Sequence, residues 1–288
     1  MKVARFLNNG RLQAGVVDTD AGCVFPFDPG LTDITDLIRL TSGGVSVSKP
    51  EGRPIPLDRI KLAAPIVPRR NIFCVGKNYT AHAKEFAGSG FEAGAVKGRE
   101  IDEYPAIFSK PPSTIIGPED EVELHPEVTS AVDYEAELAV VIGRPGRNIT
   151  QTNAMSHVWG YTIVNDVTAR DRQRNHKQWF AGKALDTFCP MGPWIVSADE
   201  LDSTNLDIEC RVNGELRQKA NTRDLIFNIP QLLEAISGGL TLQAGDVIAT
   251  GTPAGVGIGY DPPRFLKAGD IVEISISGIG TLRNSFIE

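Results

Sequence analysis

The sequence has few cysteines, and their spacing excludes two common uses of this residue. Only four occur in 288 residues, and no two of them form a Cys-x-x-Cys pair. This pattern fits neither a zinc site nor a disulfide framework, so we expect Cys74 and Cys210 to be reduced packing residues. The four histidines are equally scattered. Any bound metal is therefore expected to have oxygen ligands.

Long apolar runs and long basic clusters are also missing. No segment approaches the roughly 20 apolar residues that span a bilayer, and the first ten residues lack the apolar core of a signal peptide. The net charge is −7, and no basic run is longer than Arg69-Arg70. We therefore expect a cytoplasmic protein that binds neither nucleic acid nor a membrane.

The chain is long enough to bury a sizeable core, and two domains are predicted. Residues 1–64 contain short strand patterns and one helical pattern, at residues 34–40. A proline-rich stretch at residues 50–56 is typical of a linker. We expect a small N-terminal α+β domain over residues 1–64 and a catalytic domain over residues 65–288.

The second domain is predicted to be mostly β. Short β-branched segments alternate with glycine and proline, and Asn213-Gly214 is a strong hairpin signal between two of them. Residues 271–280 form a second hairpin pattern, whereas helical patterns are confined to residues 152–158 and 229–236. Many short strands with few helices indicate a β-rich α+β fold of the barrel or roll type.

Two glutamates, Glu135 and Glu137, stand at the start of the apolar segment 138–142. Because side chains alternate along a strand, both point to one face of a strand that runs into the core. A Mg²⁺ or Mn²⁺ ion would compensate for burying them, and Asp166, after the apolar segment 161–164, would supply a third oxygen. The alternative, which the two glutamates alone favour equally, is a solvated strand face.

His82 and Glu85 are three positions apart, so they share one face of a helical turn. A carboxylate beside an imidazole raises its basicity and fixes its orientation, as a general base requires. Taken alone, such a pair is more often a surface ion pair. It precedes residues 87–103, a glycine-rich charged stretch that we expect to be a mobile loop, and lids of this kind often carry catalytic groups.

Two further features favour a ligand-binding pocket. Lys183 stands among mainly apolar residues, so it is either a core-edge residue whose ammonium reaches solvent or a charge directed into a pocket. The glycine-rich stretch 251–259 ends in Pro262-Pro263 where a dinucleotide site would need a helix. We expect instead a loop whose backbone closely approaches a ligand, with Thr252 as a hydroxyl donor.

Together these motifs resemble the fumarylacetoacetate hydrolase (FAH) family. They are similar to its smaller branch, which includes acylpyruvate hydrolases, oxaloacetate decarboxylases, dienedioate isomerases and the FAH domain-containing protein 2 group. The matching stretches, in the family's order, are residues 75–85, 108–111, 133–137, 165–171, 183–188 and 250–257. The resemblance implies a mixed β-sandwich roll, or pseudo-barrel, assembled as a homodimer.

The resemblance also implies a role for each candidate residue. The implied roles are metal binding for Glu135, Glu137 and Asp166, catalysis for His82, Glu85 and Lys183, and substrate binding for Arg170, Gln173 and Thr252. The animal fumarylacetoacetate enzymes carry a fourth acidic residue where this chain has Asn78. That departure argues against fumarylacetoacetate itself as the substrate.

We therefore expect an Mg²⁺- or Mn²⁺-dependent hydrolase that cleaves a C–C bond in a β-diketo acid of the acylpyruvate or fumarylpyruvate type. His82, oriented by Glu85, would deprotonate the attacking water, and Lys183 would stabilise the leaving enolate. The alternative is a metal-dependent 2-oxo acid decarboxylase or a 2-hydroxyhepta-2,4-diene-1,7-dioate isomerase, which need no nucleophilic water. A third reading, a metal-loaded binding protein without activity, is disfavoured by the presence of both His82 and Glu85.

Overall fold

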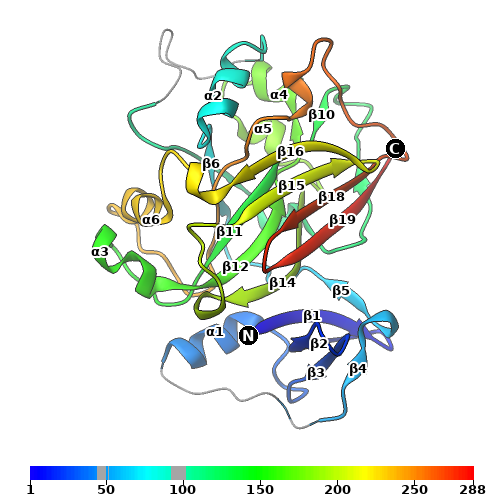
Figure 1. Cartoon of the computed structure of the whole chain (residues 1–288), viewed down its shortest axis with the longest axis vertical. Helices are drawn as coiled ribbons and strands as arrows, with labels where there is room; N and C mark the ends of the chain where they lie inside the picture. The colour runs from blue at the N-terminus through cyan, green and yellow to red at the C-terminus, as the bar shows by residue number, and fades with distance from the viewer. Residues whose placement is uncertain (44–49, 51, 92–101) are drawn as a thin grey trace.

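The computed structural model describes residues 1–43, 50, 52–91 and 102–288, which are coloured in Figure 1. In these residues strands predominate and form a twelve-stranded, a five-stranded and a two-stranded sheet. The predicted β-rich α+β class is therefore confirmed. Part of the predicted loop at residues 87–103 lies outside the described residues.

The largest sheet is mainly antiparallel, and two short strands pair beside its main path. Its strands, in spatial order, are β4 (Ile55–Pro56), β3 (Cys23–Pro26), β2 (Arg11–Asp18), β1 (Lys2–Asn8), β14 (Cys189–Ser197), β12 (Val158–Asn165), β11 (Ala136–Ile142), β17 (Val247–Ala249), β6 (Ile72–Gly76) and β7 (Ala106–Lys110), with β5 (Lys61–Ala63) beside β1 and β8 (Ile115–Ile116) beside β14.

The two smaller sheets are built from strands that all lie after residue 121. Their strands are β16 (Glu215–Asn221), β15 (Asp207–Val212), β18 (Ile271–Ile276), β19 (Gly280–Ile287) and β9 (Val122–Glu123) in one sheet, and β10 (Val132–Asp133) with β13 (Thr168–Ala169) in the other. Asn213-Gly214 connects β15 to β16, and β18 with β19 forms the second predicted hairpin. Both hairpin predictions are confirmed.

Short helices connect the strands. The α-helices of the described residues are α1 (Ile34–Ser42), α2 (Thr80–Ala87), α3 (Gln151–Ala154), α4 (Arg170–Asn175), α5 (Phe180–Lys183) and α6 (Ile229–Ser237). The single-turn 3₁₀ helices are η1 (Leu57–Arg59), η2 (Pro112–Thr114), η3 (Met155–His157), η4 (Ala198–Glu200), η5 (Thr222–Asp224) and η6 (Gly257–Gly259). Within this part of the chain, no helix is both long and apolar enough to cross a membrane.

The large sheet is covered on both faces, which explains the continuous apolar sequence of β11. Leu138 and Val140 belong to the main apolar cluster, beneath the five-stranded sheet, whereas Ala139 and Val141 belong to a second cluster that includes α1. Every residue of β11 is buried. A strand buried on both faces reads as an unbroken hydrophobic run rather than an alternating one. The prediction that the strand enters the core is confirmed.

The N-terminal strands extend the large sheet instead of forming a separate one. Lys2 and Val3 of β1 pair with Val196 and Ile195 of β14. In Figure 1 these blue strands occupy the bottom of the molecule, while α2, α4 and α5 lie together at the opposite end. The proposed domain boundary after residue 64 therefore falls within a continuous hydrogen-bonded sheet, and the division stays a prediction.

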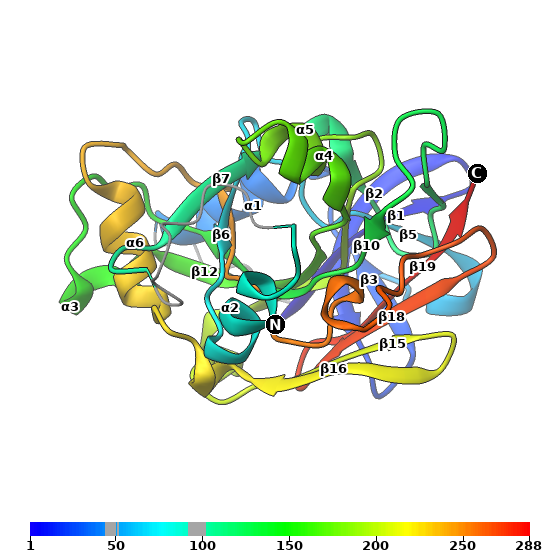
Figure 2. The same ribbon diagram turned by 90° about the horizontal axis from the view of Figure 1, so that it is seen from above.

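Sheet topology brings four strand ends to one edge. The strand β12 is antiparallel to β11, as is β17, and β6 is parallel to β17. The carboxyl ends of β6, β12 and β17 therefore meet the amino end of β11. Figure 2, viewed from above, shows α4 and α5 across from α2 at this end of the molecule.

The helix α1 gives a test of local stability. The Asp33 carboxylate accepts a hydrogen bond from the Thr35 amide at 2.8 Å and caps the helix. Asp33→Ala is expected to lower the free energy of unfolding by about 1 kcal/mol in urea denaturation, because an amide donor loses its partner. Asp36→Ala on the same turn is the control. An equal loss for both variants would contradict the capping role.

Candidate active site

Three carboxylates meet at this edge of the sheet. Glu135 precedes β11 by one residue, Glu137 lies in that strand, and Asp166 follows β12. One oxygen of each lies within 4.8 Å of the others, and all three residues are buried. The Asp166 amide donates to the Glu135 carbonyl at 2.9 Å, which holds the two segments together. Burial excludes the alternative of a solvated strand face.

Two lysines bind this group from the side of β7 and α5. The Lys183 ammonium donates to Glu135 Oε2 at 2.8 Å and to Asp166 Oδ2 at 2.7 Å. Lys110 donates to the other oxygen of Asp166 at 2.7 Å. Burial by itself would lower the pKa of Lys183. The negative charges of Asp166 and Glu135 have the larger combined effect, so the pKa of Lys183 is raised above its ordinary value. Lys183 is thus a buried charge within the site and does not reach solvent.

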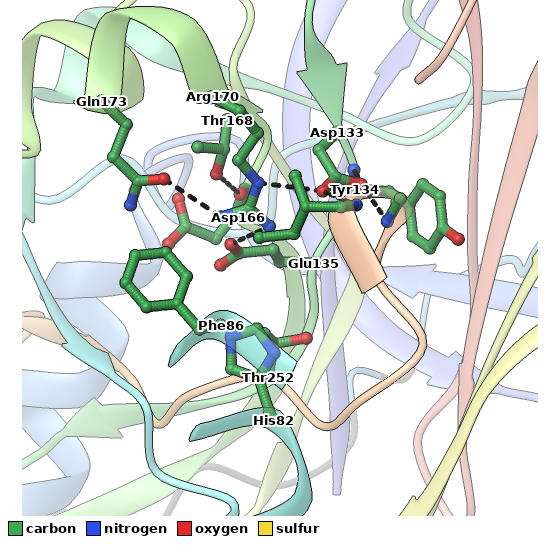
Figure 3. Close-up of polar contacts among 12 residues, drawn as sticks. His82, Phe86, Asp133, Tyr134, Glu135, Asp166, Thr168, Arg170, Gln173 and Thr252 are labelled. Atoms are coloured by element: carbon green, nitrogen blue, oxygen red, sulfur yellow. Dashed lines mark hydrogen bonds and ion pairs between the residues drawn. The ribbon is translucent and has the colours of Figure 1, made fainter. Parts of the chain in front are cut away.

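Arg170, at the start of α4, is directed toward the protein's own carboxylates. Its Nε donates to Asp133 Oδ2 at 2.9 Å, and a terminal nitrogen lies 2.7 Å from Glu135 Oε1. The other terminal nitrogen donates to Gln173 at 3.1 Å. In Figure 3, Glu135 lies between Arg170 and Gln173 on one side and His82 on the other. Arg170 therefore positions Glu135, in addition to lining the cavity described below.

His82 is buried and Glu85 is 15% exposed, so the pair is not the solvent-exposed ion pair considered above. His82 Nδ1 lies 3.0 Å from Glu85 Oε2, on α2, and His82 is 4% exposed. Because an ionised carboxylate only accepts hydrogen bonds, Nδ1 is assigned as the protonated nitrogen. Nε2 of His82 is then left as the basic nitrogen.

The glycine-rich loop at residues 251–259 binds carboxylates of the protein itself through backbone amides. Gly251 N donates to Glu137 Oε2 at 2.8 Å, and Gly255 N donates to Glu85 Oε1 at 2.9 Å. Both glycines have a positive φ, +106° and +101°, which side-chain-bearing residues rarely adopt. These amides hold a triad member and the partner of His82, and the expected approach of the loop to a ligand stays a prediction.

Two more amides of the same loop clamp Asp133. Gly257 N lies 2.6 Å from Asp133 Oδ1, and Ile258 N lies 3.2 Å from Oδ2. Burial raises the pKa of Asp133, although the positive charge of Arg170 and the hydrogen bond from Gly257 oppose the rise. Asp133 in turn orients Arg170, so the loop acts on the triad from two directions.

Thr252 lies deeper in the loop and is buried. Its Oγ1 accepts a hydrogen bond from Gln218 Nε2 at 2.8 Å, which leaves its own O–H able to donate. Gln218 also donates to the Pro253 carbonyl at 2.7 Å and accepts from the Ala136 amide at 3.0 Å. The strand β16 therefore fixes both the loop and the start of β11.

These groups surround a small cavity with about 280 Å³ of space free of protein atoms, including its opening to solvent. Seven of the nine predicted site residues line it, namely His82, Glu135, Glu137, Arg170, Gln173, Lys183 and Thr252. Aromatic side chains form another part of the wall, with Trp179 in edge contact with Phe86 and Phe108. The remaining two predicted residues, Glu85 and Asp166, bind His82 and Lys183.

The charges of this buried cluster do not balance. Apart from the His82–Glu85 pair, the described ion pairs join three carboxylates, Asp133, Glu135 and Asp166, to three cations, Lys110, Arg170 and Lys183. Glu137 is the fourth carboxyl group of the cluster, and in its ionised form it adds one surplus negative charge. Burial raises the pKa of Glu135, but Lys183 and Arg170 outweigh it and lower the pKa to about 2. Burial, Asp166 and Glu135 raise the pKa of Glu137 well above its usual value. Glu137 is the carboxyl group of the four that has no ion pair among the described contacts, and its raised pKa means that it releases its proton less readily than an ordinary glutamate.

The residues present fit a hard divalent cation. All three donor groups are carboxylates, which suit Mg²⁺ and Mn²⁺. Two added positive charges would turn the surplus into one positive charge, which an anionic ligand would neutralise. The role of the triad as metal ligands stays a prediction that this charge count supports.

Three polar residues that hold the carboxylates, Arg170 and the glycine-rich loop in place were not predicted from the sequence: Lys110, Asp133 and Gln218. Lys110 and Asp133 stand in stretches that match the family, so the sequence drew attention to both positions but indicated no role for either side chain. Gln218 lies in an ordinary hairpin strand and carries no signal. Asn78 bonds to backbone: its amide donates to the Thr250 carbonyl at 2.8 Å and accepts from the Phe227 amide at 2.7 Å.

Comparison with known proteins identifies the family. The family model described as fumarylacetoacetate (FAA) hydrolase C-terminal matches residues 71–287. The chain belongs to the fumarylacetoacetate hydrolase family, as its motifs indicated, and it is an enzyme of that family. A solved structure of the fumarylacetoacetate hydrolase from psychrophilic Exiguobacterium antarcticum superimposes with a TM-score of 0.87 at 43% identity, covering 100% of this chain and 99% of that one. The predicted FAH-type fold is therefore confirmed.

Two curated relatives place the chain in the predicted small branch. Oxaloacetate tautomerase YisK of Bacillus subtilis is 54% identical over 230 residues, 79% of this chain and 73% of that protein. The human mitochondrial protein named oxaloacetate tautomerase FAHD2A is 44% identical over 236 residues, 81% of this chain and 71% of that protein.

Removal of the surplus charge tests the cation site. Glu137→Gln keeps an oxygen for the Gly251 amide, so we expect the metal-free protein to remain at least as stable as the wild type. Mn²⁺ at a hundredfold excess over its Kd should stabilise the wild type by about 2.7 kcal/mol and the variant far less. Thermal denaturation with and without Mn²⁺ measures both effects. Glu123→Gln, at an exposed position on β9, is the control, and an unchanged Mn²⁺ response in Glu137→Gln would contradict the assignment.

Proposed function

We propose that this protein catalyses metal-dependent proton transfer on a 2-oxo acid, interconverting the keto and enol forms of an oxaloacetate-like compound. The observation that carries the proposal is the shared cavity, in which an oriented imidazole faces a carboxylate triad and a buried ammonium. The relative of 54% identity, named as an oxaloacetate tautomerase, supports this choice.

His82 is the proposed base. Enolisation removes the proton from the carbon beside the ketone; its electron pair forms the C=C bond, and the carbonyl pair moves to oxygen. With Nδ1 bound to Glu85, Nε2 of His82 takes that proton, and the imidazolium then gives a proton to the enolate oxygen, which completes the enol; the same two transfers in reverse restore the keto form. Glu85 stabilises the imidazolium that forms, and Gly255 N holds Glu85 in place.

Lys183 is the proposed partner of the developing negative charge. An ammonium has three donors, and the described contacts of Lys183 use two of them, on Glu135 and Asp166. The third donor is therefore available for the enolate oxygen, and the raised pKa of Lys183 keeps it protonated. The Thr252 hydroxyl and Gln173 line the same cavity and can bind the substrate carboxylate.

A divalent cation held by Glu135, Glu137 and Asp166 would supply Lewis-acid polarisation of the 2-oxo group. We propose Mg²⁺ or Mn²⁺ as this cofactor, since the donors are all carboxylate oxygens.

The second candidate is the hydrolysis predicted from the sequence, C–C cleavage of an acylpyruvate or fumarylpyruvate. The His82–Glu85 pair favours it, because the same base can deprotonate a water instead of a carbon acid. Decarboxylation of a 2-oxo acid and isomerisation of a hydroxydienedioate also need a stabilised enolate. The reactions differ in whether His82 deprotonates a carbon acid or a water molecule, and in whether the leaving group is an enolate, CO₂ or absent.

We also propose a cytoplasmic homodimer that acts on a small molecule and binds neither nucleic acid nor a membrane. All four cysteines are buried free thiols, as is usual in a reducing compartment. The homodimer is the assembly that the family resemblance implies. A separate domain over residues 1–64 belongs to the same set of proposals.

A panel of substrates tests the reaction. With Mg²⁺, we expect the decay of enol-oxaloacetate absorbance to be accelerated, and His82→Ala to reduce that rate by about 100-fold or more because the base is lost. His176→Ala, at an exposed histidine, is the control. Acetylpyruvate cleavage, CO₂ release from oxaloacetate and turnover of hydroxyheptadienedioate are measured in parallel. A higher kcat/KM for acetylpyruvate than for oxaloacetate would favour hydrolysis.

A glycine substitution tests the orientation of His82. A Cβ on Gly259 would lie 1.8 Å from Glu85 Oε1, so Gly259→Ala must displace that carboxylate. We expect kcat to fall about 10- to 100-fold while Mn²⁺ still stabilises the protein, because the triad is not touched. Gly52→Ala, where a Cβ meets nothing within 4 Å, is the control. Wild-type kcat in Gly259→Ala would show that the Glu85 contact is dispensable.

A further inference from the structure

A fourth cation, Lys77, lines the cavity without a described contact to the inner carboxylates. It follows Gly76, the last residue of β6, and leads into α2. Its side chain is 9% exposed, and its ammonium forms an ion pair with Asp102. Lys77 was part of a family-like stretch but was given no role by the sequence.

The partner of Lys77 differs from the partners of the other cavity cations. Lys183 and Arg170 bind carboxylates that are at most 6% exposed, within the triad and its supports. Asp102 is 23% exposed and is not among the residues that line the cavity. An anion that enters the cavity can therefore replace Asp102, because the released carboxylate regains water and the lysine keeps an anionic partner.

The backbone around Lys77 is held in an unusual conformation. Lys77 has a φ of +55°, which is uncommon for a residue with a side chain and occurs often at functional sites. The neighbouring Gly76 packs so closely on Trp179 that a Cβ there would lie 2.1 Å from the indole ring. This contact fixes the end of β6 at the cavity, so the position of Lys77 is not that of a free surface lysine.

We propose that Lys77 binds the second carboxylate of a dicarboxylate substrate and that Asp102 occupies this position when no such substrate is present. The inference rests on the proposed function for the oxo-acid end, and it adds the residue that separates dicarboxylates from monocarboxylates. The inner cations are committed to protein carboxylates, so they supply less of this discrimination. If a substrate carboxylate replaces Asp102 on Lys77, removing the lysine charge should weaken dicarboxylate binding and removing the aspartate charge should strengthen it.

Binding of unreactive probes tests this assignment. Calorimetry on the full chain with Mg²⁺ compares malate, a 2-hydroxy dicarboxylate, with lactate, a 2-hydroxy monocarboxylate. In the wild type we expect malate to bind more tightly. Lys77→Met should weaken malate binding about tenfold or more and leave lactate unchanged, since one charged hydrogen bond is lost. Asp102→Asn should tighten malate binding, because a competing anion is removed.

Two further variants serve as controls. Lys77→Arg keeps the charge and should retain the preference for malate, which separates loss of charge from loss of folding. Lys84→Met, at an exposed lysine of α2, should change neither affinity. Equal malate and lactate affinities in the wild type, no measurable malate binding, or equal weakening of both probes by Lys77→Met would overturn the proposal. Because no turnover is measured, a failure of the tautomerase assay with intact malate preference would reject the proposed reaction but not this site.

Discussion

The structure depends on the burial of more negative than positive charge at one edge of the large sheet. The carboxylates of Asp133, Glu135, Glu137 and Asp166 are each 6% exposed or less, and such groups are tolerated only when they are paired. The pairing requires cations from β7, α4 and α5, which fixes how these elements pack around the sheet. Glu137, the carboxyl group that has no ion pair among the described contacts, is the member of the proposed metal triad that a divalent cation would pair.

The glycine-rich loop at residues 251–259 also stabilises buried carboxylates, but it does so with backbone amides. Its amides bind Glu137, Glu85 and Asp133, three acids with different roles. A backbone amide brings a donor without the bulk of a side chain, and positive φ values at Gly251 and Gly255 make the required path possible. The loop thereby links α2, which carries the proposed base, to the carboxylates proposed to hold the cation. A change in the loop is therefore expected to affect both groups, although through different glycines.

One arrangement of residues can serve several reactions of 2-oxo acids. Tautomerisation, decarboxylation and C–C hydrolysis all pass through an enolate, so all of them need positive charge near the ketone oxygen. Lys183 provides such a charge whichever bond breaks. The identity of the reaction is then set by which atom faces His82 Nε2 and by what occupies the remainder of the cavity. The proposed role of Lys77, which lies apart from the triad, concerns the choice of substrate and not the class of chemistry.

Much of the site was readable from the sequence because its signals are local. Alternation along the predicted strand placed Glu135 and Glu137 on one face, the three-residue spacing placed His82 with Glu85, and Asn213-Gly214 marked a hairpin. The motif order was enough to identify the family and its fold.

Local patterns carry no information on partners distant in the chain, however. Lys183 had two interpretations until folding placed it between Glu135 and Asp166, 48 and 17 positions away. Only the tertiary structure paired the loop amides with acids more than 100 residues distant in the chain. It also decided that Arg170 binds Asp133 and that Glu137 has no ion pair among the described contacts. The physical reason is that charge balance in a buried site depends on which elements the sheet topology brings together.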